Sequence, residues 1–142
     1  MWADTLLAAE RTHLLRLALW GAASLLIGTT LVMMLRFGRP QSPLAEHFGI
    51  QTAVWGAVEL AMALLLLRSL TLRDLSAATQ LDRLLWMNIG LDVGYALVGV
   101  TLVVVGWRAV RRFGMVGAGI GIVLQGAALA MIDLLFAGQI SR

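Results

Sequence analysis

The dominant pattern in the sequence is a set of four long apolar stretches separated by short polar connections. We expect helices over about residues 14–35, 48–67, 86–107 and 114–137. Each has the roughly 20 residues that a helix needs to cross about 30 Å of hydrocarbon. Four spans place both chain ends on the same side of a membrane. The pattern predicts an all-α integral membrane four-helix bundle, formed by a single transmembrane domain over residues 1–142.

The two ends of each apolar stretch carry typical boundary residues. Trp86 and Trp107 bracket the third stretch, about 31 Å apart along a helix, which is the spacing of interfacial aromatic anchors. Ser42 is a candidate helix cap, with Pro43 in the first turn of the second helix. The stretch from Asp4 to Arg16 is also predicted to be helical. Leucine spacing in the second connection indicates that the third helix begins before the membrane.

The composition agrees with a membrane protein and excludes several other classes. Hydrophobic residues make up 60% of the chain and charged residues 13%, whereas soluble domains are about 45–50% apolar. The net charge of +3 comes from arginines at helix ends, where they bind lipid phosphates, so we expect no nucleic-acid partner. The chain has no cysteine. With no catalytic, phosphate-binding or zinc motif either, we expect no metal, no cofactor and no enzymatic activity.

The arginines barely distinguish the two sides of the membrane. Six lie on the side of the chain ends and five on the opposite side, a difference too small to fix the orientation by the positive-inside rule. A single fixed topology and dual insertion both stay open. The arginines on the side of the chain ends are Arg11, Arg16, Arg68, Arg73, Arg83 and Arg142. Those on the opposite side are Arg36, Arg39, Arg108, Arg111 and Arg112.

The two halves of the chain resemble each other. Residues 26–32 match residues 97–103 at a shift of 71, and Gly56-Ala57 matches Gly126-Ala127 at a shift of 70. These matches favour two similar αα-hairpins related by an axis along the membrane normal. Chance similarity between apolar segments is the alternative.

Three acids fall within the apolar stretches: Glu59, Asp92 and Asp133. A charge near the bilayer centre costs about 2.5 kcal/mol or more, so such residues normally face the protein interior. We expect no basic residue at comparable depth. Asp133 is expected nearest the interface. The acids therefore either form a proton or cation path or belong to a buried hydrogen-bond cluster.

Other polar residues share helix faces with these acids. Asn88, Asp92, Tyr95 and Gly99 are spaced four, three and four residues apart, so they lie on one face of the third helix, with the phenol near the carboxylate. Gln125 lies at mid-membrane in the fourth helix. We expect a polar seam between the second, third and fourth helices, in the half nearer the chain ends. Its members are Glu59, Asn88, Asp92, Tyr95, Gln125 and Asp133.

Small residues and histidines suggest further roles. Gly117 and Gly121 form a G-x-x-x-G pair that would allow close helix packing, as would Gly99. We expect the first two to pack a second copy of the chain in a homo-oligomer. His13 and His47 are interpreted as interfacial residues at opposite membrane faces, about 30 Å apart and too distant to clamp one haem.

Two motifs carry a resemblance to a known family. Leu91-Asp92-x-x-Tyr95-x-x-x-Gly99 and Gln125-Gly126-x-x-Leu129-x-x-x-Asp133 resemble a small bacterial family of four-span membrane proteins classed as a domain of unknown function. The resemblance implies a multi-pass protein of the bacterial inner (plasma) membrane, with the polar residues of both motifs in its core. Glu59 departs from the family, which more often has an amide in its second helix.

Three hypotheses for function follow. The first is a small proton- or cation-linked transporter or channel that uses Glu59 and Asp92, with Asn88, Tyr95 and Gln125 as hydrogen-bonding partners. The second is a non-catalytic accessory or assembly subunit of a larger membrane complex, which predicts partner membrane subunits. The third is a lipid- or quinone-binding protein that uses Trp55 and the polar seam.

Overall fold

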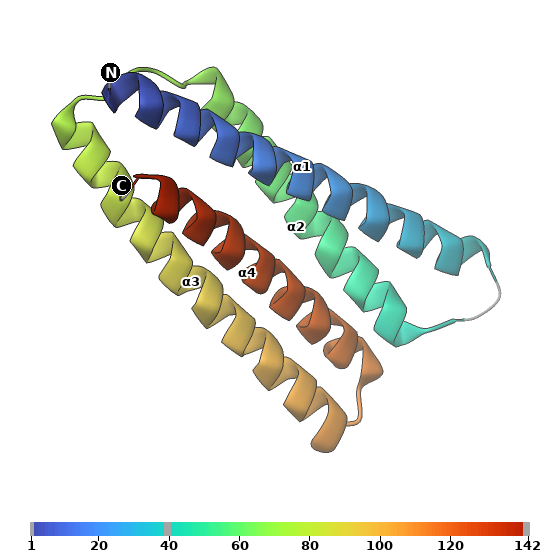
Figure 1. The fold of residues 1–142 in the computed structure, drawn as a ribbon. Coiled ribbons are helices and arrows are strands. Elements are labelled where there is room, and N and C mark those ends of the chain that lie inside the picture. The colour runs from blue at the N-terminus through green and yellow to red at the C-terminus, as the bar shows by residue number, and fades with distance from the viewer. Residues whose placement is uncertain (1, 39–40, 141–142) are drawn as a thin grey trace.

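The computed structural model describes residues 2–38 and 41–140, and the described chain is built from four α-helices (Figure 1). The helices are α1 (Trp2–Phe37), α2 (Pro43–Arg68), α3 (Leu75–Arg108) and α4 (Phe113–Ile140). All four are long and apolar enough to cross a membrane. The predicted all-α four-helix fold is therefore confirmed. Arg39 and Arg142, two of the arginines counted above, lie outside the described residues.

Local sequence explains where the helices begin. Ser42 caps α2 by accepting a hydrogen bond from the Ala45 amide at 3.3 Å, with Pro43 in the first turn as predicted. Asp74 caps α3 in the same way, through the Ala77 amide at 2.7 Å. The N-terminal stretch and the first span form one continuous helix of 36 residues.

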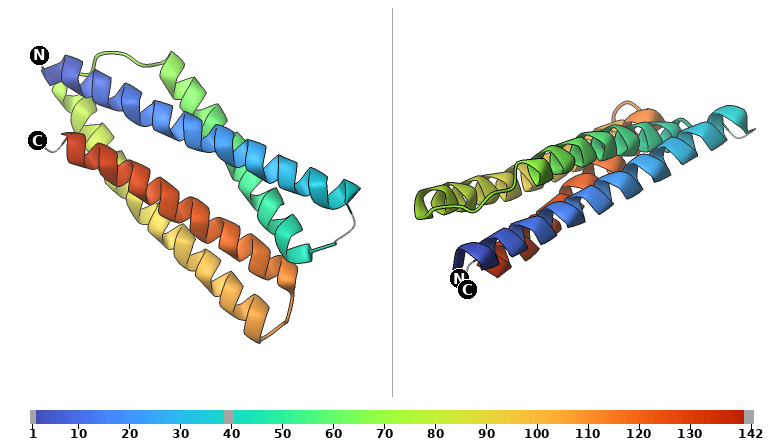
Figure 2. Two further views of the ribbon diagram at one scale, coloured as in Figure 1. Left: turned by 45° about the vertical axis from the view of Figure 1, so that its right-hand side comes forward. Right: turned by 90° about the horizontal axis from the view of Figure 1, so that it is seen from above.

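The helices pack as two antiparallel hairpins, α1 with α2 and α3 with α4. α2 lies against α4 between the hairpins, and α1 also contacts α4. Both chain ends lie at one end of the bundle, together with the connection between α2 and α3 (Figure 2). Within the described residues, no Cα atom of α2 comes within 8 Å of one in α3. The bundle is therefore open on the side between these two helices.

Glycines set the same helix register in both hairpins. A Cβ atom on Gly28 of α1 would lie 2.5 Å from the carbonyl oxygen of Gly49 in α2. A Cβ atom on Gly99 of α3 would lie 2.8 Å from the carbonyl oxygen of Gly119 in α4. The second pair repeats the first at shifts of 71 and 70 residues. Each glycine allows backbones to approach where any side chain would overlap.

A second contact repeats in the same way. A Cβ atom on Gly56 would lie 2.7 Å from the Gly21 carbonyl oxygen, and one on Gly126 would lie 2.6 Å from the Asp92 carbonyl oxygen. These residues are again related by shifts of 70 and 71. The two hairpins are therefore similar in packing as well as in sequence.

Gly117 and Gly121 pack closely against another helix, as predicted, but that helix is α2 of the same chain and not one of a second copy. Both glycines are buried within the chain, because α4 presents them to α2. A Cβ atom on Gly117 would overlap the Leu44 carbonyl, and one on Gly121 would lie 3.1 Å from Gln51. This surface is therefore used to join the two hairpins.

The two tryptophans predicted as interface anchors lie on the outside of α3. Trp86 is 55% exposed and Trp107 is 60% exposed. The ring of Trp107 packs edge-on against Phe113 at the start of α4, with 5.9 Å between centroids. Their exposure is what an anchoring role requires, and that role stays a prediction.

Candidate functional site

A cavity of about 400 Å³ lies between α2 and α3. α2 and α3 form its two walls, and residues of α1 and α4 complete it. Most of its lining is aliphatic. The titratable and amide residues that line it are Glu10, His13, Glu59, Arg73, Asn88, Asp92 and Asp133.

The cavity brings the three intramembrane acids together. Glu59 of α2, Asp92 of α3 and Asp133 of α4 all line it, and Asp92 lies within electrostatic range of the other two. In the described chain no hydrogen bond joins any of these carboxylates to another. The acids therefore share one space without satisfying one another. Asn88 of α3 lines the same wall and is exposed.

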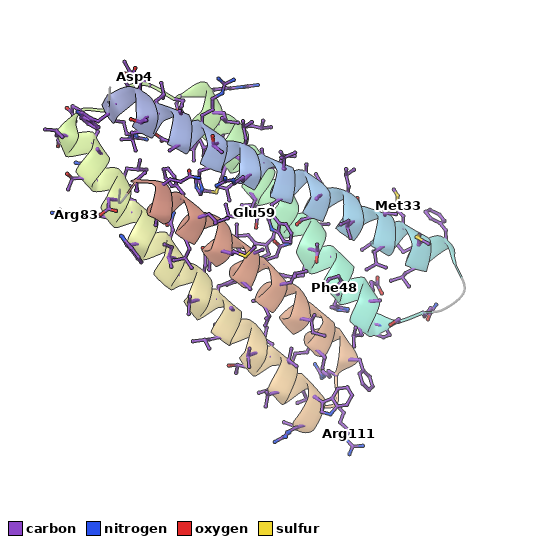
Figure 3. All side chains as sticks on the ribbon, in the orientation of Figure 1. Asp4, Met33, Phe48, Glu59, Arg83 and Arg111 are labelled. Atoms are coloured by element: carbon purple, nitrogen blue, oxygen red, sulfur yellow. The ribbon has the colours of Figure 1, made fainter. Side chains whose placement is uncertain are left out.

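Glu59 is the most unusual of the three acids. The residue is only 7% exposed and lies toward the middle of the bundle (Figure 3). Both carboxylate oxygens are buried, and neither has a hydrogen-bond partner. Leaving a buried polar group unsatisfied costs about 1–3 kcal/mol, and more when it is charged. The fold therefore retains Glu59 at a cost to its own stability.

Asp133 has a basic neighbour, which corrects the prediction that no basic residue lies at comparable depth. It is 5% exposed, and its Oδ1 lies 3.5 Å from Nε2 of His13. His13 is buried as well, stacked on Phe136 with 4.5 Å between ring centroids. Because α1 continues unbroken and packs on α4, His13 faces the inside of the bundle at its level along the helices. A basic residue thus lies at the depth of Asp133.

A second ion pair lies at the end of the cavity near the chain ends. Arg73, in the connection between α2 and α3, donates to both carboxylate oxygens of Glu10 in α1, at 2.5 and 2.9 Å. This hydrogen bonding raises the pKa of the Arg73 guanidinium above its ordinary value. The pair ties the connection to α1, so α1 also contributes to the site, in addition to the three helices predicted.

At the opposite end, the cavity-lining Trp55 of α2 packs against Tyr95 of α3. The Tyr95 hydroxyl accepts hydrogen bonds from Gln51 at 2.9 Å and from the indole of Trp55. The predicted bond between Tyr95 and Asp92 is absent from the described residues. The tyrosine ring instead crosses the gap to α2, where it packs edge-on against Trp55 with 5.0 Å between centroids.

Gln125 also differs from its predicted role. It is fully buried and accepts a hydrogen bond from the Trp20 indole at 2.7 Å. Its amide donates to Ser24 at 3.1 Å. Gln125 therefore joins α4 to α1 and is not a partner of the three acids.

The repeat explains why the cavity lies on one side only. The shifts of 70 and 71 residues relate Trp55 to Gln125 and Tyr95 to Ser24. The Trp55–Tyr95 contact between α2 and α3 is thus the counterpart of the Gln125–Ser24 contact between α4 and α1. Two large aromatic rings replace an amide and a hydroxyl. They act as a spacer that holds α2 and α3 apart where α1 and α4 are in contact.

The described residues offer no metal centre. No group of three or more histidine, aspartate or glutamate side chains within residues 2–38 and 41–140 is arranged to hold a metal ion. His47 lies exposed at the far end of the bundle from His13, with its Nδ1 2.9 Å from the Pro43 carbonyl.

Sequence reasoning missed Glu10, His13 and Arg73 as parts of the site. Glu10 and Arg73 are 63 residues apart, and no helical periodicity links them. Charged residues of opposite sign near the same end of neighbouring helices were the only available signal.

Comparison with known proteins assigns the chain to a family. The model of a family of unknown function, DUF6992, matches residues 16–134, and the chain belongs to this family. Neither the comparison with curated proteins nor that with solved structures found a match.

Proposed function

We propose that this member of DUF6992 is a proton- or cation-linked membrane transporter whose exchange site is the cavity between α2 and α3. The observation that carries the proposal is Glu59, a buried acid with no hydrogen-bond partner on either oxygen. Ionisable residues at membrane depth are expensive, and they commonly mark ion or proton pathways. Asp92 and Asp133 on the same cavity add two more sites that can exchange a proton or a cation.

The geometry supports a transporter over an open channel. The residue of α2 that lines the cavity farthest from the chain ends is Trp55, which packs against Tyr95 of α3. Beyond it, Gln51 of α2 donates a hydrogen bond to Tyr95 and lies against Gly121 of α4. A site that is closed at one end fits alternating access, in which the two sides of the membrane are reached in turn. Following the family resemblance, we propose that it is a multi-pass protein of the bacterial inner (plasma) membrane.

Flux measurements on reconstituted vesicles test this proposal. The purified protein is placed in liposomes that contain a pH-sensitive dye, and a proton, sodium or potassium gradient is imposed. We expect gradient-driven flux above that of empty liposomes. Glu59→Gln and Asp92→Asn should abolish it, because each removes an ionisable group and changes the shape little.

Two matched controls make the same chemical changes away from the cavity. Glu46→Gln alters a partly exposed acid at the far end, 3.9 Å from Arg36. Asp82→Asn alters an exposed acid of α3 that does not line the cavity. Flux should persist in both. The proposal is rejected if no flux is seen, or if the cavity variants carry as much flux as the controls.

A further inference from the structure

We propose that the cavity binds an amphipathic organic cation, which enters sideways from the lipid between α2 and α3. This inference rests on the proposed function and names the class of its cargo: a molecule with an amine or quaternary ammonium group and an apolar body.

The size and lining of the cavity fit an organic molecule. Its volume of about 400 Å³ lies within the range of about 300–1,000 Å³ typical of small-molecule sites. Side chains such as Leu17, Val58, Leu129 and Phe136 cover most of its surface. A bare inorganic cation needs several oxygen ligands at short range, and no group of three or more histidine, aspartate or glutamate side chains among the described residues could hold one. An apolar body would instead bury its surface against these side chains.

The charges on the cavity call for a positive ligand. Arg73 is engaged by Glu10, and His13 lies beside Asp133. Glu59 and Asp92 have no basic partner in the described chain. A buried carboxylate is stabilised by a paired cation, so an ammonium group would compensate Glu59. The indole of Trp55 at the closed end offers a face for the same cation.

The open side of the bundle provides the route. Four residues that line the cavity are also 47–62% exposed: Met62 and Leu66 on α2, and Leu84 and Leu91 on α3. They form an apolar rim at which the backbones of the two helices stay apart. A molecule already dissolved in the bilayer meets mainly apolar side chains there, together with the exposed amide of Asn88 on α3. At the end near the chain ends, the cavity is instead bordered by the Glu10–Arg73 ion pair, which offers no apolar surface to a lipid-dissolved molecule.

Equilibrium dialysis with matched probes tests the ligand class. The full chain in detergent micelles is dialysed with tetraphenylphosphonium, with tetraphenylborate (the same shape with opposite charge) or with tetramethylammonium (the same charge without the apolar body). Empty micelles at equal detergent concentration give the background. We expect saturable binding of tetraphenylphosphonium alone. Glu59→Gln should weaken it at least about tenfold, because it removes the buried charge, whereas Glu46→Gln should not.

A second variant tests the route without touching a polar group. Leu91→Trp narrows the rim, and Leu97→Trp makes the same change at an equally exposed position of α3 (62%) that does not line the cavity. We expect Leu91→Trp, but not Leu97→Trp, to weaken or slow tetraphenylphosphonium binding by about tenfold in the same dialysis experiment. The proposal is overturned if the phosphonium and the borate bind alike, or if neither Glu59→Gln nor Leu91→Trp changes phosphonium binding.

The ligand class and the transport proposal fail in different ways. Proton or inorganic cation flux without phosphonium binding overturns the organic ligand and leaves transport standing. Selective phosphonium binding without any flux supports the organic-cation site and overturns the transport proposal.

Discussion

Two buried polar residues of similar length should respond in opposite ways to the same substitution. Glu59 and Gln125 are both more than nine-tenths buried. Gln125 is satisfied by Trp20 and Ser24, whereas both oxygens of Glu59 lack a partner. Methionine is an unbranched, flexible apolar side chain that fits either space. We therefore compare Glu59→Met with Gln125→Met.

The magnitudes follow from the hydrogen bonds present at each site. Glu59→Met removes an unsatisfied buried group and breaks no hydrogen bond, so we expect the free energy of unfolding to rise by about 1–3 kcal/mol. Gln125→Met breaks two bonds. Side-chain bonds in membrane proteins average about 0.6 kcal/mol and reach about 1.7 kcal/mol, so the expected loss is about 1–3 kcal/mol.

The assay is reversible unfolding of both variants in mixed micelles of a mild detergent and sodium dodecyl sulfate, followed by helical circular dichroism. The unfolding midpoint should shift to higher denaturant for Glu59→Met and to lower denaturant for Gln125→Met. The same Glu59→Met protein should lose flux in liposomes, since a residue retained against stability at a functional site typically trades one for the other.

An equal loss of stability in the two variants would refute this reasoning. It would mean that Glu59 has a stabilising partner, and that the acid serves packing rather than exchange. If Glu59→Met is more stable but keeps its full flux, the cost assigned to the buried carboxylate is correct, but Glu59 has no part in transport.

Three further predictions follow from the packing. Tyr95→Ser removes the spacer and should let α2 approach α3, whereas Tyr95→Phe keeps the ring and should leave the two helices apart. Because the chain has no cysteine of its own, disulfide formation between one cysteine engineered on each helix measures the approach, and it should rise only in Tyr95→Ser. Gly28→Ala should lower the free energy of unfolding by about 1–3 kcal/mol, because the added Cβ atom would lie 2.5 Å from backbone atoms. Gly94→Ala should not lower it, because a Cβ atom there has nothing within 4 Å. Denaturant unfolding of the two variants measures both free energies. Arg73→Ala should cost about 1–3 kcal/mol by leaving Glu10 buried and unpaired. Hydrogen bonding to Glu10 raises the pKa of the Arg73 guanidinium above its already high ordinary value, so the stabilisation is complete at lower pH and lost only above that value. The wild-type advantage over Arg73→Ala should therefore be unchanged from about pH 7 to about pH 10.

Much of the architecture could be predicted from residue order. Four apolar runs of membrane length specify four helices, because lipid offers no hydrogen bonds and each segment must satisfy its backbone internally. The Ser42 cap is equally local. The shifts of 70 and 71 residues also anticipated two similar hairpins, since a glycine that sets register in one hairpin recurs in the other.

The candidate site was predictable only in part. The acids could be named, because charge within an apolar run is conspicuous in any sequence. Their surroundings could not. The partners of Gln125 and Asp133 come from α1, and the pairing of Arg73 with Glu10 joins positions that no periodicity relates.

The sequence by itself determined how many helices there are, how long they are and which faces are polar, since these depend on contacts within a few residues. Only the tertiary structure decided which polar groups meet and where the bundle stays open. Those outcomes depend on how each helix is rotated and tilted against its neighbours. In this protein, glycine contacts and the bulk of the Trp55–Tyr95 pair set that geometry.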